Sequence, residues 1–304
     1  MRTSYIYMCI FFFTIIYTKT YESYIGTFNL IYNDKKYEND ELGDKIKAFT
    51  KTITDRFGAV DHNHFNIYIY STNKKFMESC EYLTGWEVGL AINKKQKKII
   101  IKGPKIMSKG ARQFMSVLRH ELAHIYLFKK AGTIKVPDWF EEGFAMYIAQ
   151  EFNLNRKILI SEAYWQDTII GYENLIFFRK MHTQQVKLAY AQSSALIEYI
   201  VEKYSSQVMD KIIHSIGAGI GFFSAIELSL EKKYNELLDE ANTVIPQKYK
   251  WYILIRLSKY IFYISPFILI CGYLATRLRN KKVLAAWEIE DMIEDIDRSR
   301  GADS

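Results

Sequence analysis

The chain has 304 residues, of which 49% are hydrophobic and 25% charged, so it has room for one large domain or two small ones. Its formal net charge of +7 comes from lysines and arginines scattered along the sequence. No internal repeat and no basic block with interleaved aromatic residues occurs, so we expect no nucleic-acid partner.

The N-terminal segment predicts a secretory signal. The run YIYMCIFFFTIIY (Tyr5–Tyr17) follows Arg2 and is 13 residues long. This length suits the apolar region of a signal peptide and is short for a membrane-spanning helix. A small-residue cleavage site is poorly defined around Thr18 to Ser23. We therefore expect residues 1–20 to be a signal peptide or an uncleaved signal anchor.

Two segments upstream of residue 108 predict β-structure. The run FNIYIY (Phe65–Tyr70) alternates and is rich in aromatic and β-branched residues, which is typical of a strand. The segment EVGLAINKKQKKIIIKG predicts a hairpin whose turn lies at Asn93 to Gln96.

A long helix is expected next. Ser108 is of a residue type that caps helix N-termini, and Gly132 is of the type that ends helices. Apolar residues between them recur at three- and four-residue spacing, as one helix face requires: Phe114, Leu118, Leu122 and Ile125.

The sequence HELAH at the centre of this helix indicates a metal site. His120 and His124 are four residues apart, so their side chains converge on one point of the helix surface. Glu121 is rotated by about 100°, so it can take a proton from water that the metal activates without being a ligand. The alternative is that two histidines and an acid share a helix by chance, and a third ligand would decide against it.

The segment PDWFEEGFAMYIAQEF supplies candidates for the third ligand. A second helix is expected to begin at Pro137, whose fixed φ suits a first turn. It carries Glu141 and Glu142, which point about 100° apart, so both cannot face one metal ion. The spacing leaves open which of them does so, and also leaves open that both are solvated helix acids.

HELAH followed by WFEEGFAMY resembles the gluzincin metallopeptidases, and more closely their peptidase MA-like and aminopeptidase N-like branches. The resemblance implies an α+β, zincin-like fold with a mixed sheet, active-site helices and a helical C-terminal portion. It also implies zinc as cofactor. The ligands would be His120, His124 and Glu142, the acid before the glycine, with Glu121 as general base. Glu141 would then be an outward acid or a partner of a ligand.

The sequence departs from these families at two places. Thermolysin-type enzymes carry an aspartate four residues after the ligand glutamate, where this chain has Met146, so the histidines need another partner. The Gly-x-Met-Glu-Asn segment of aminopeptidases is absent, and Glu87 is not in that context. Aminopeptidase activity is therefore not implied.

The resemblance also implies two further substrate contacts. Lys98–Lys102 would be the edge strand that binds extended peptide through its backbone. The alternative is an ordinary edge strand guarded by lysines. Tyr190, at the start of a predicted helix KLAYAQSSALIEYIVEKY, would donate to the oxyanion. The alternative for Tyr190 is a packing role.

The glycine-rich segment Gly217–Gly221 lacks the strand and the Lys-Ser or Lys-Thr of a phosphate loop, so we expect a turn there.

The C-terminal segment predicts a membrane anchor. Tyr260–Thr276 contains 17 residues without charge and ends at RLRNKK, a stop-transfer pattern. We expect a transmembrane helix over residues 251–276 and a cytoplasmic tail over residues 277–304. A buried core helix is the alternative.

The remaining domain, residues 21–250, contains only one cysteine, Cys80, so no disulfide can form within it.

The sequence therefore predicts a single-pass cell-membrane zinc metallopeptidase with an extracytoplasmic catalytic domain and peptide or protein substrates. The alternative is a non-catalytic membrane-anchored sensor or assembly factor that keeps the zincin fold. Glu121 discriminates between them, because a purely structural metal site has no use for a carboxylate at that position.

Overall fold

The computed structural model describes residues 17–32, 34, 40–80, 87–93 and 97–301. The chain divides into two compact units, one ending at Lys250 and one comprising Trp251–Ser304. The strands of the first unit are β1 (Tyr17–Ser23), β2 (Gly26–Tyr32), β3 (Phe65–Tyr70), β4 (Gly89–Ile92) and β5 (Lys98–Lys102). Its α-helices are α1 (Asp40–Phe57), α2 (Asn73–Glu78), α3 (Gly110–Ala131), α4 (Asp138–Ala149), α5 (Leu154–Trp165), α6 (Thr183–Tyr204), α7 (Gln207–Gly217), α8 (Phe222–Leu230) and α9 (Tyr234–Tyr249).

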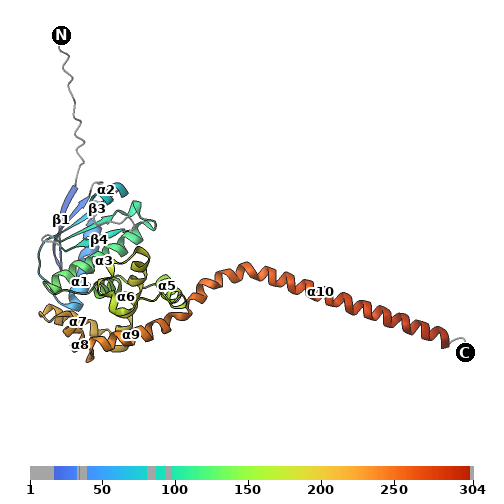
Figure 1. The fold of residues 1–304 in the computed structure, drawn as a ribbon. Helices are drawn as coiled ribbons and strands as arrows, with labels where there is room; N and C mark the ends of the chain where they lie inside the picture. Colours follow the sequence, from blue (N-terminus) through green and yellow to red (C-terminus); the bar gives the residue numbers. More distant parts are fainter. Residues whose placement is uncertain (1–16, 33, 35–39, 81–86, 94–96, 302–304) are drawn as a thin grey trace, which may run out of the picture. The chain divides into compact units, whose positions relative to one another are not determined.

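The strands form one mixed sheet in the order β1-β2-β3-β5-β4 (Figure 1). The β1–β2 and β4–β5 pairs are antiparallel, whereas β2–β3 and β3–β5 are parallel. The predicted strand at Phe65–Tyr70 and the predicted hairpin are confirmed; the central residues of its turn, 94–96, lie outside the described residues. The predicted edge strand at Lys98–Lys102 is wrong. That segment, β5, is paired on both sides, and β4 is the edge, because strand order depends on tertiary pairing that local sequence does not encode.

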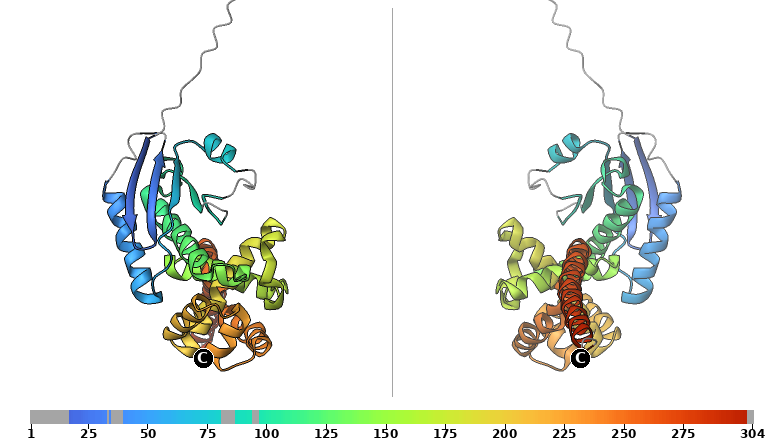
Figure 2. Two further views of the ribbon diagram at one scale, coloured as in Figure 1. Left: turned by 90° about the vertical axis from the view of Figure 1, so that its left-hand side faces the viewer. Right: turned by 90° about the vertical axis from the view of Figure 1, so that its right-hand side faces the viewer.

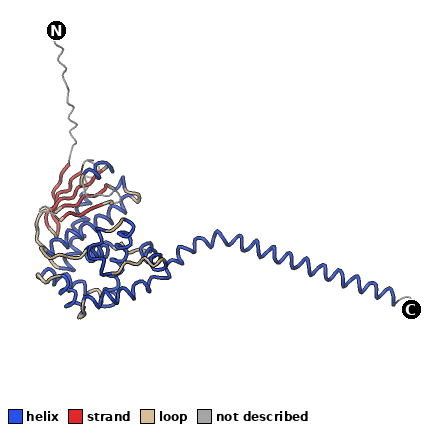
Figure 3. Tube along the Cα trace, viewed as in Figure 1, coloured by secondary structure: helices blue, strands red, loops and turns tan. Residues whose placement is uncertain are grey.

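The sheet and the helices share a core. Helix α1 packs against β1, as Figure 2 shows, and α3 packs against β4 and β5. Strand residues such as Phe28, Phe65, Ile67 and Ile99 are fully buried there. Figure 3 shows strands gathered in one part of this unit and helices filling the rest. The α+β class and the helical C-terminal portion are confirmed.

Helix α3 differs from its prediction only at its start. The predicted cap Ser108 is wrong, because the helix begins at Gly110 and no side chain caps it. The Gln113 side chain instead accepts hydrogen bonds from Ser108 Oγ, at 3.0 Å, and from the Lys109 backbone N–H, at 3.1 Å. Gly132 ends the helix with φ of 57°, as expected. The four predicted apolar residues are all buried.

Close packing of α4 against α6 positions the segment that carries Glu141 and Glu142. Pro137 precedes α4 as its N-cap residue, so the helix begins at Asp138, one position later than predicted. A methyl group at Gly143 would lie 2.7 Å from Ile197 Cγ1 and 2.8 Å from the Ser193 carbonyl oxygen. The glycine after Glu142 therefore allows α4 to approach α6 closely. The helix predicted around Tyr190 is confirmed as α6. Of the turn predicted at Gly217–Gly221, residues 218–221 lie between α7 and α8, and Gly217 is the last residue of α7.

The two predicted membrane-related segments fall at the ends of the chain. Residues 1–16 of the predicted signal lie outside the described residues, and its last four residues, 17–20, belong to β1. In the second unit, helix α10 (Ile253–Gly301) runs on beyond residue 276. Among the described residues, no single helix has the length and apolar character of a membrane span. The segments Tyr234–Ser258 and Tyr263–Ile293 meet that requirement only when taken together.

Candidate metal and catalytic site

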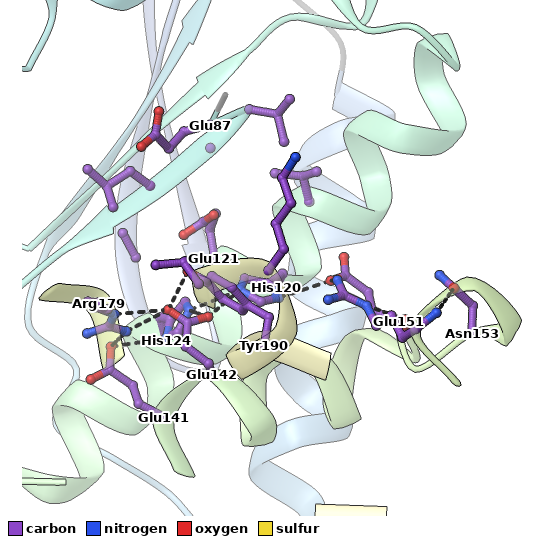
Figure 4. Close-up of a pocket in the computed structure, with 18 of the residues that line it drawn as sticks. Glu87, His120, Glu121, His124, Glu141, Glu142, Glu151, Asn153, Arg179 and Tyr190 are labelled. Atoms are coloured by element: carbon purple, nitrogen blue, oxygen red, sulfur yellow. Dashed lines mark hydrogen bonds and ion pairs between the residues drawn. The ribbon is translucent and has the colours of Figure 1, made fainter. Parts of the chain in front are cut away.

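Three potential ligand atoms converge where α3 meets α4 (Figure 4). His120 Nε2 lies 3.0 Å from His124 Nε2 and 3.2 Å from Glu142 Oε2. His124 Nε2 lies 3.4 Å from the same carboxylate oxygen. The three atoms thus form a nearly equilateral triangle, with His124 and Glu142 buried and His120 nearly so.

The triangle fits a tetrahedral zinc ion. Zinc bonds of about 2.0–2.1 Å to nitrogen and oxygen place tetrahedral ligand atoms roughly 3.3 Å apart. The observed separations of 3.0, 3.2 and 3.4 Å bracket that value. Two imidazoles and one carboxylate are also a zinc-binding donor set that leaves a fourth position for another ligand.

Glu142 is held so that only one of its oxygens faces the histidines. Its Oε1 accepts hydrogen bonds from Arg179 Nη2, at 2.6 Å, and from the Tyr190 hydroxyl, at 3.2 Å. Its Oε2 remains directed at the two imidazoles. Arg179, from the 3₁₀ segment Tyr172–Lys180, also donates to Glu141 and pairs with Asp138. This clamp fixes the carboxylate in an orientation suited to a single metal bond.

The far side of each imidazole faces a second carboxylate. His120 Nδ1 lies 3.3 Å from Glu151 Oε2, and His124 Nδ1 lies 3.4 Å from Glu141 Oε1. Both are within ion-pair distance but lack hydrogen-bond geometry, and neither Nδ1 has another partner among the described residues. Met146 cannot orient a histidine as an aspartate at that position would, and Glu151 and Glu141 are placed to do so instead. Such outer carboxylates orient metal-binding imidazoles and raise their basicity.

The electrostatics of the cluster follow from these contacts. Burial opposes protonation of His120, but the nearby carboxylates of Glu142 and Glu151 prevail and raise its pKa to about 10. Burial likewise opposes protonation of His124, yet Glu142 and Glu141 raise its pKa to about 9. Although burial acts the other way, Arg179 and the histidines hold the pKa of Glu142 well below its ordinary value. The carboxylates of Glu141, Glu142 and Glu151 therefore favour a positive charge at the triangle of ligand atoms.

Glu121 lies beside the triangle, under the edge strand. It is 6% exposed, and burial raises its pKa, while both histidines and the Ala91 backbone N–H act in the opposite direction. A methyl group at Gly89 would lie 2.9 Å from Glu121 Oε1 and 2.6 Å from Val117 Cγ1. Glycine at position 89 therefore permits β4 to pass directly over the carboxylate.

A cavity of about 960 Å³ opens onto these groups. It is lined by His120, His124 and Glu142, which form the triangle, and by Glu121 and Tyr190. Residues 87–91, in and just before the edge strand β4, also line it. Arg156, at the start of α5, and Lys187, in α6, line it as well. The cavity is large enough for several residues of an extended peptide.

The five site residues predicted from the sequence come together here: His120, Glu121, His124, Glu142 and Tyr190. The segment Lys98–Lys102 does not line the cavity, and β4 does so instead. Arg179 and Glu151 were not predicted. Arg179 is 37 residues from Glu142 in a segment without a motif, and Glu151 follows Gln150, whose left-handed φ of 57° turns the chain back toward α3. No local pattern reveals either contact.

Comparison with known proteins gives one family. The model of the Peptidase MA superfamily matches residues 46–235. No curated protein sequence matches the chain.

Several solved structures are similar at low identity. A mutant M1 zinc metallopeptidase from Deinococcus radiodurans is 12% identical with a TM-score of 0.46, over 75% of this chain and 52% of that one. An aminopeptidase N family protein from Idiomarina loihiensis is 12% identical with a TM-score of 0.49, over 75% and 46%. Native yeast LTA4 hydrolase is 12% identical with a TM-score of 0.41, over 77% and 39%. The chain spans about half the length of the first of these structures, and identity this low says nothing of its substrate.

Proposed function

The chain belongs to the Peptidase MA superfamily, a gluzincin-type family of metallopeptidases, and we propose that it is a zinc-dependent metallopeptidase that hydrolyses peptide bonds. The observation that carries this proposal is the triangle of His120 Nε2, His124 Nε2 and Glu142 Oε2, with Glu121 beside it. A zinc ion held by these three residues would supply Lewis acidity to a peptide carbonyl and to water.

Glu121 and Tyr190 carry the proton and the oxyanion in this proposal. Glu121 accepts a proton from the attacking water and delivers it to the leaving amine, because its carboxylate borders the cavity. Tyr190 donates a hydrogen bond to the carbonyl oxygen as negative charge develops there. Burial, together with the nearby Glu142, raises the pKa of Tyr190 well above its ordinary value, so its hydroxyl keeps the proton that it must donate.

Strand β4 positions the substrate. As the last strand of the described sheet, it has one side of its backbone without a strand partner, and that region lines the cavity. An extended peptide can pair with this edge through backbone hydrogen bonds, which depend on chain direction more than on side chains. The Lys98–Lys102 segment first assigned to this role is excluded by its pairing on both sides.

The test uses the purified full-length protein. We expect one zinc per chain by metal analysis, cleavage of members of a peptide library, loss of cleavage with a chelator, and recovery when zinc is returned. Zinc binding without cleavage of any library member would favour the non-catalytic sensor or assembly factor. Cleavage that persists after complete removal of the metal would contradict the proposal.

We also propose that the second unit anchors the chain in the cell membrane, with the catalytic domain outside the cytoplasm. Large apolar side chains of α10 are exposed, including Phe267 at 70% and Leu269 at 73%, and lipid would cover them. A reporter fused after Ser304 should appear cytoplasmic, while protease added outside intact cells should digest the domain before Lys250. An externally exposed C-terminus would contradict this topology.

A further inference from the structure

Two cationic side chains line the cavity without a role in the proposed hydrolysis. Arg156 is the third residue of α5, and Lys187 is the fifth residue of α6. They come from helices that pack against one another. They define the α5–α6 side of the cavity, whereas the metal triangle lies on its α3–α4 side.

Charged groups of the other wall already have partners. Glu141 and Glu142 accept hydrogen bonds from Arg179. Glu151 faces His120 and accepts a hydrogen bond from Ser116 Oγ at 3.0 Å. Glu121 is close to both histidines and accepts from the Ala91 backbone N–H. The acids around the metal triangle are thus committed to the site itself.

Arg156 and Lys187 retain binding capacity. Arg156 Nε donates to the Glu151 carbonyl oxygen at 3.1 Å, and its Nη2 lies 3.7 Å from Glu151 Oε2. Its Nη1 makes no hydrogen bond with a described residue. Lys187 is exposed to the cavity and makes neither a hydrogen bond nor an ion pair within the described part of the chain. Both cations therefore remain available to an anionic group in the cavity.

The position of Lys187 sets a distance from the reacting bond. It precedes Tyr190 by three residues on α6, so the two lie on one helix face about 4.5 Å apart along the axis. Tyr190 in turn contacts Glu142 at 3.2 Å. An extended peptide advances about 3.3 Å per residue, so this axial offset between Lys187 and Tyr190 corresponds to one or two residues of a bound peptide.

We propose that Arg156 and Lys187 form a carboxylate-binding subsite, so that favoured substrates carry a carboxylate within about two residues of the cleaved bond. The carboxylate is either an acidic side chain or a free C-terminus. Arginine offers planar paired donors and lysine a mobile point charge, a combination that suits carboxylate binding. This inference rests on the proposed peptidase function and names the substrate class of that same site.

Matched peptides test the subsite. A sequence cleaved by the full-length zinc-loaded protein is made with glutamate or glutamine at each of the two positions on either side of the cleaved bond. Each version is made as a free acid and as an amide, so that side-chain and C-terminal carboxylates are distinguished. We expect kcat/KM to be about 10- to 100-fold higher for one carboxylate form than for its neutral counterpart.

Two variants and a control locate the effect. Lys187→Met and Arg156→Met should each reduce this preference at least several-fold, and the double variant should abolish it. Lys47→Met removes the same charge from an exposed position on α1, which does not line the cavity, and should keep the full preference. Zinc content, measured for each variant, identifies any variant that loses the site. Arg156→Lys should recover part of the preference that Arg156→Met loses.

Binding separates failure of the subsite from failure of the peptidase. The same peptides are titrated into the Glu121→Gln protein, where binding is measured without turnover. Tighter binding of the carboxylate form, lost in the double variant with Glu121→Gln retained, supports the subsite independently of turnover. Equal binding and equal kcat/KM for charged and neutral peptides overturn the subsite while leaving the peptidase intact. A preference that survives the double variant overturns it as well.

Discussion

Helix α3 buries charged groups in two regions that are built differently. Near its C-terminus, Lys129 is 8% exposed and donates to the backbone carbonyls of Ile25, Asp61 and Asn63, above the ring of Phe65. Further back, His120, Glu121 and His124 face other ionisable side chains. One helix thus holds a closed structural contact and an open cluster.

The difference shows what marks a functional site. The carbonyl partners of Lys129 are neutral, fixed by the fold, and sufficient in number for its three donors, so no place remains for a ligand. In the other region, three acceptor atoms converge on one point and carboxylates stand behind them. Placing buried acceptors against one another is unfavourable unless a cation joins them. Convergence, and not burial alone, therefore identifies the site.

The largest expected effect lies in the open cluster. Glu121→Gln keeps the size of the side chain but removes the base, so peptide hydrolysis should fall by about 10²- to 10⁴-fold or more. Zinc content and thermal unfolding should match those of the parent protein. Equal hydrolysis rates would mean that the measured activity comes from another site. The cluster around Glu121 would then differ from the Lys129 region in structure but not in catalysis.

Tyr190→Phe should lower kcat by about 10²- to 10³-fold, because one oxyanion donor is lost. The same change removes a hydrogen bond to Glu142, so zinc affinity must be measured alongside. A rate close to that of the parent enzyme would reduce Tyr190 to a packing role beside Phe178.

Zinc affinity should separate the two adjacent acids of α4. Glu142→Ala removes a ligand and should weaken zinc binding by more than about 100-fold, whereas Glu141→Ala removes a histidine partner and should weaken it by about 10- to 100-fold. Equilibrium competition with a zinc chelator gives both values. The reverse order would show that Glu141 is the ligand.

In contrast to the changes in the open cluster, Lys129→Met should lower stability and leave zinc binding unchanged. The change strips three backbone carbonyls of their donor, so the free energy of unfolding should fall by about 1–3 kcal/mol at pH 7. Zinc affinity should stay unchanged, which denaturant unfolding and zinc titration check together. A loss of zinc binding would show that the two regions of α3 are not independent.

The smallest expected effect is a pH dependence of the Lys129 region. Burial, together with the nearby Lys97, lowers the pKa of Lys129 to about 8. Between this value and the ordinary pKa of about 10.4, the unfolded chain binds more protons than the folded one, so rising pH favours folding. From pH 8 to 9 the unfolding free energy of the parent protein should rise by up to about 1 kcal/mol relative to Lys129→Met. A flat difference would contradict the lowered pKa.

The sequence predicted the parts of the site that share a helix. His120, Glu121 and His124 follow from helical spacing alone, whereas the choice of Glu142 over Glu141 required a family resemblance. Strands β1 and β2 and helix α1 were not predicted. The apolar spacing of Ile46, Ile53 and Phe57 in α1 is nevertheless readable. Arg179, Glu151 and the order of β4 and β5 depend on contacts between distant segments, which no local periodicity reports.

The shortness of β4 has a consequence for self-association. A free strand edge is a template on which other chains can add strands, which leads to aggregation. Strand β4 has only four residues, and Val117 and Glu121 crowd the space at Gly89. A second folded sheet would gain few backbone hydrogen bonds along so short an edge. The edge can therefore stay open for catalysis with little risk of sheet-to-sheet polymerisation.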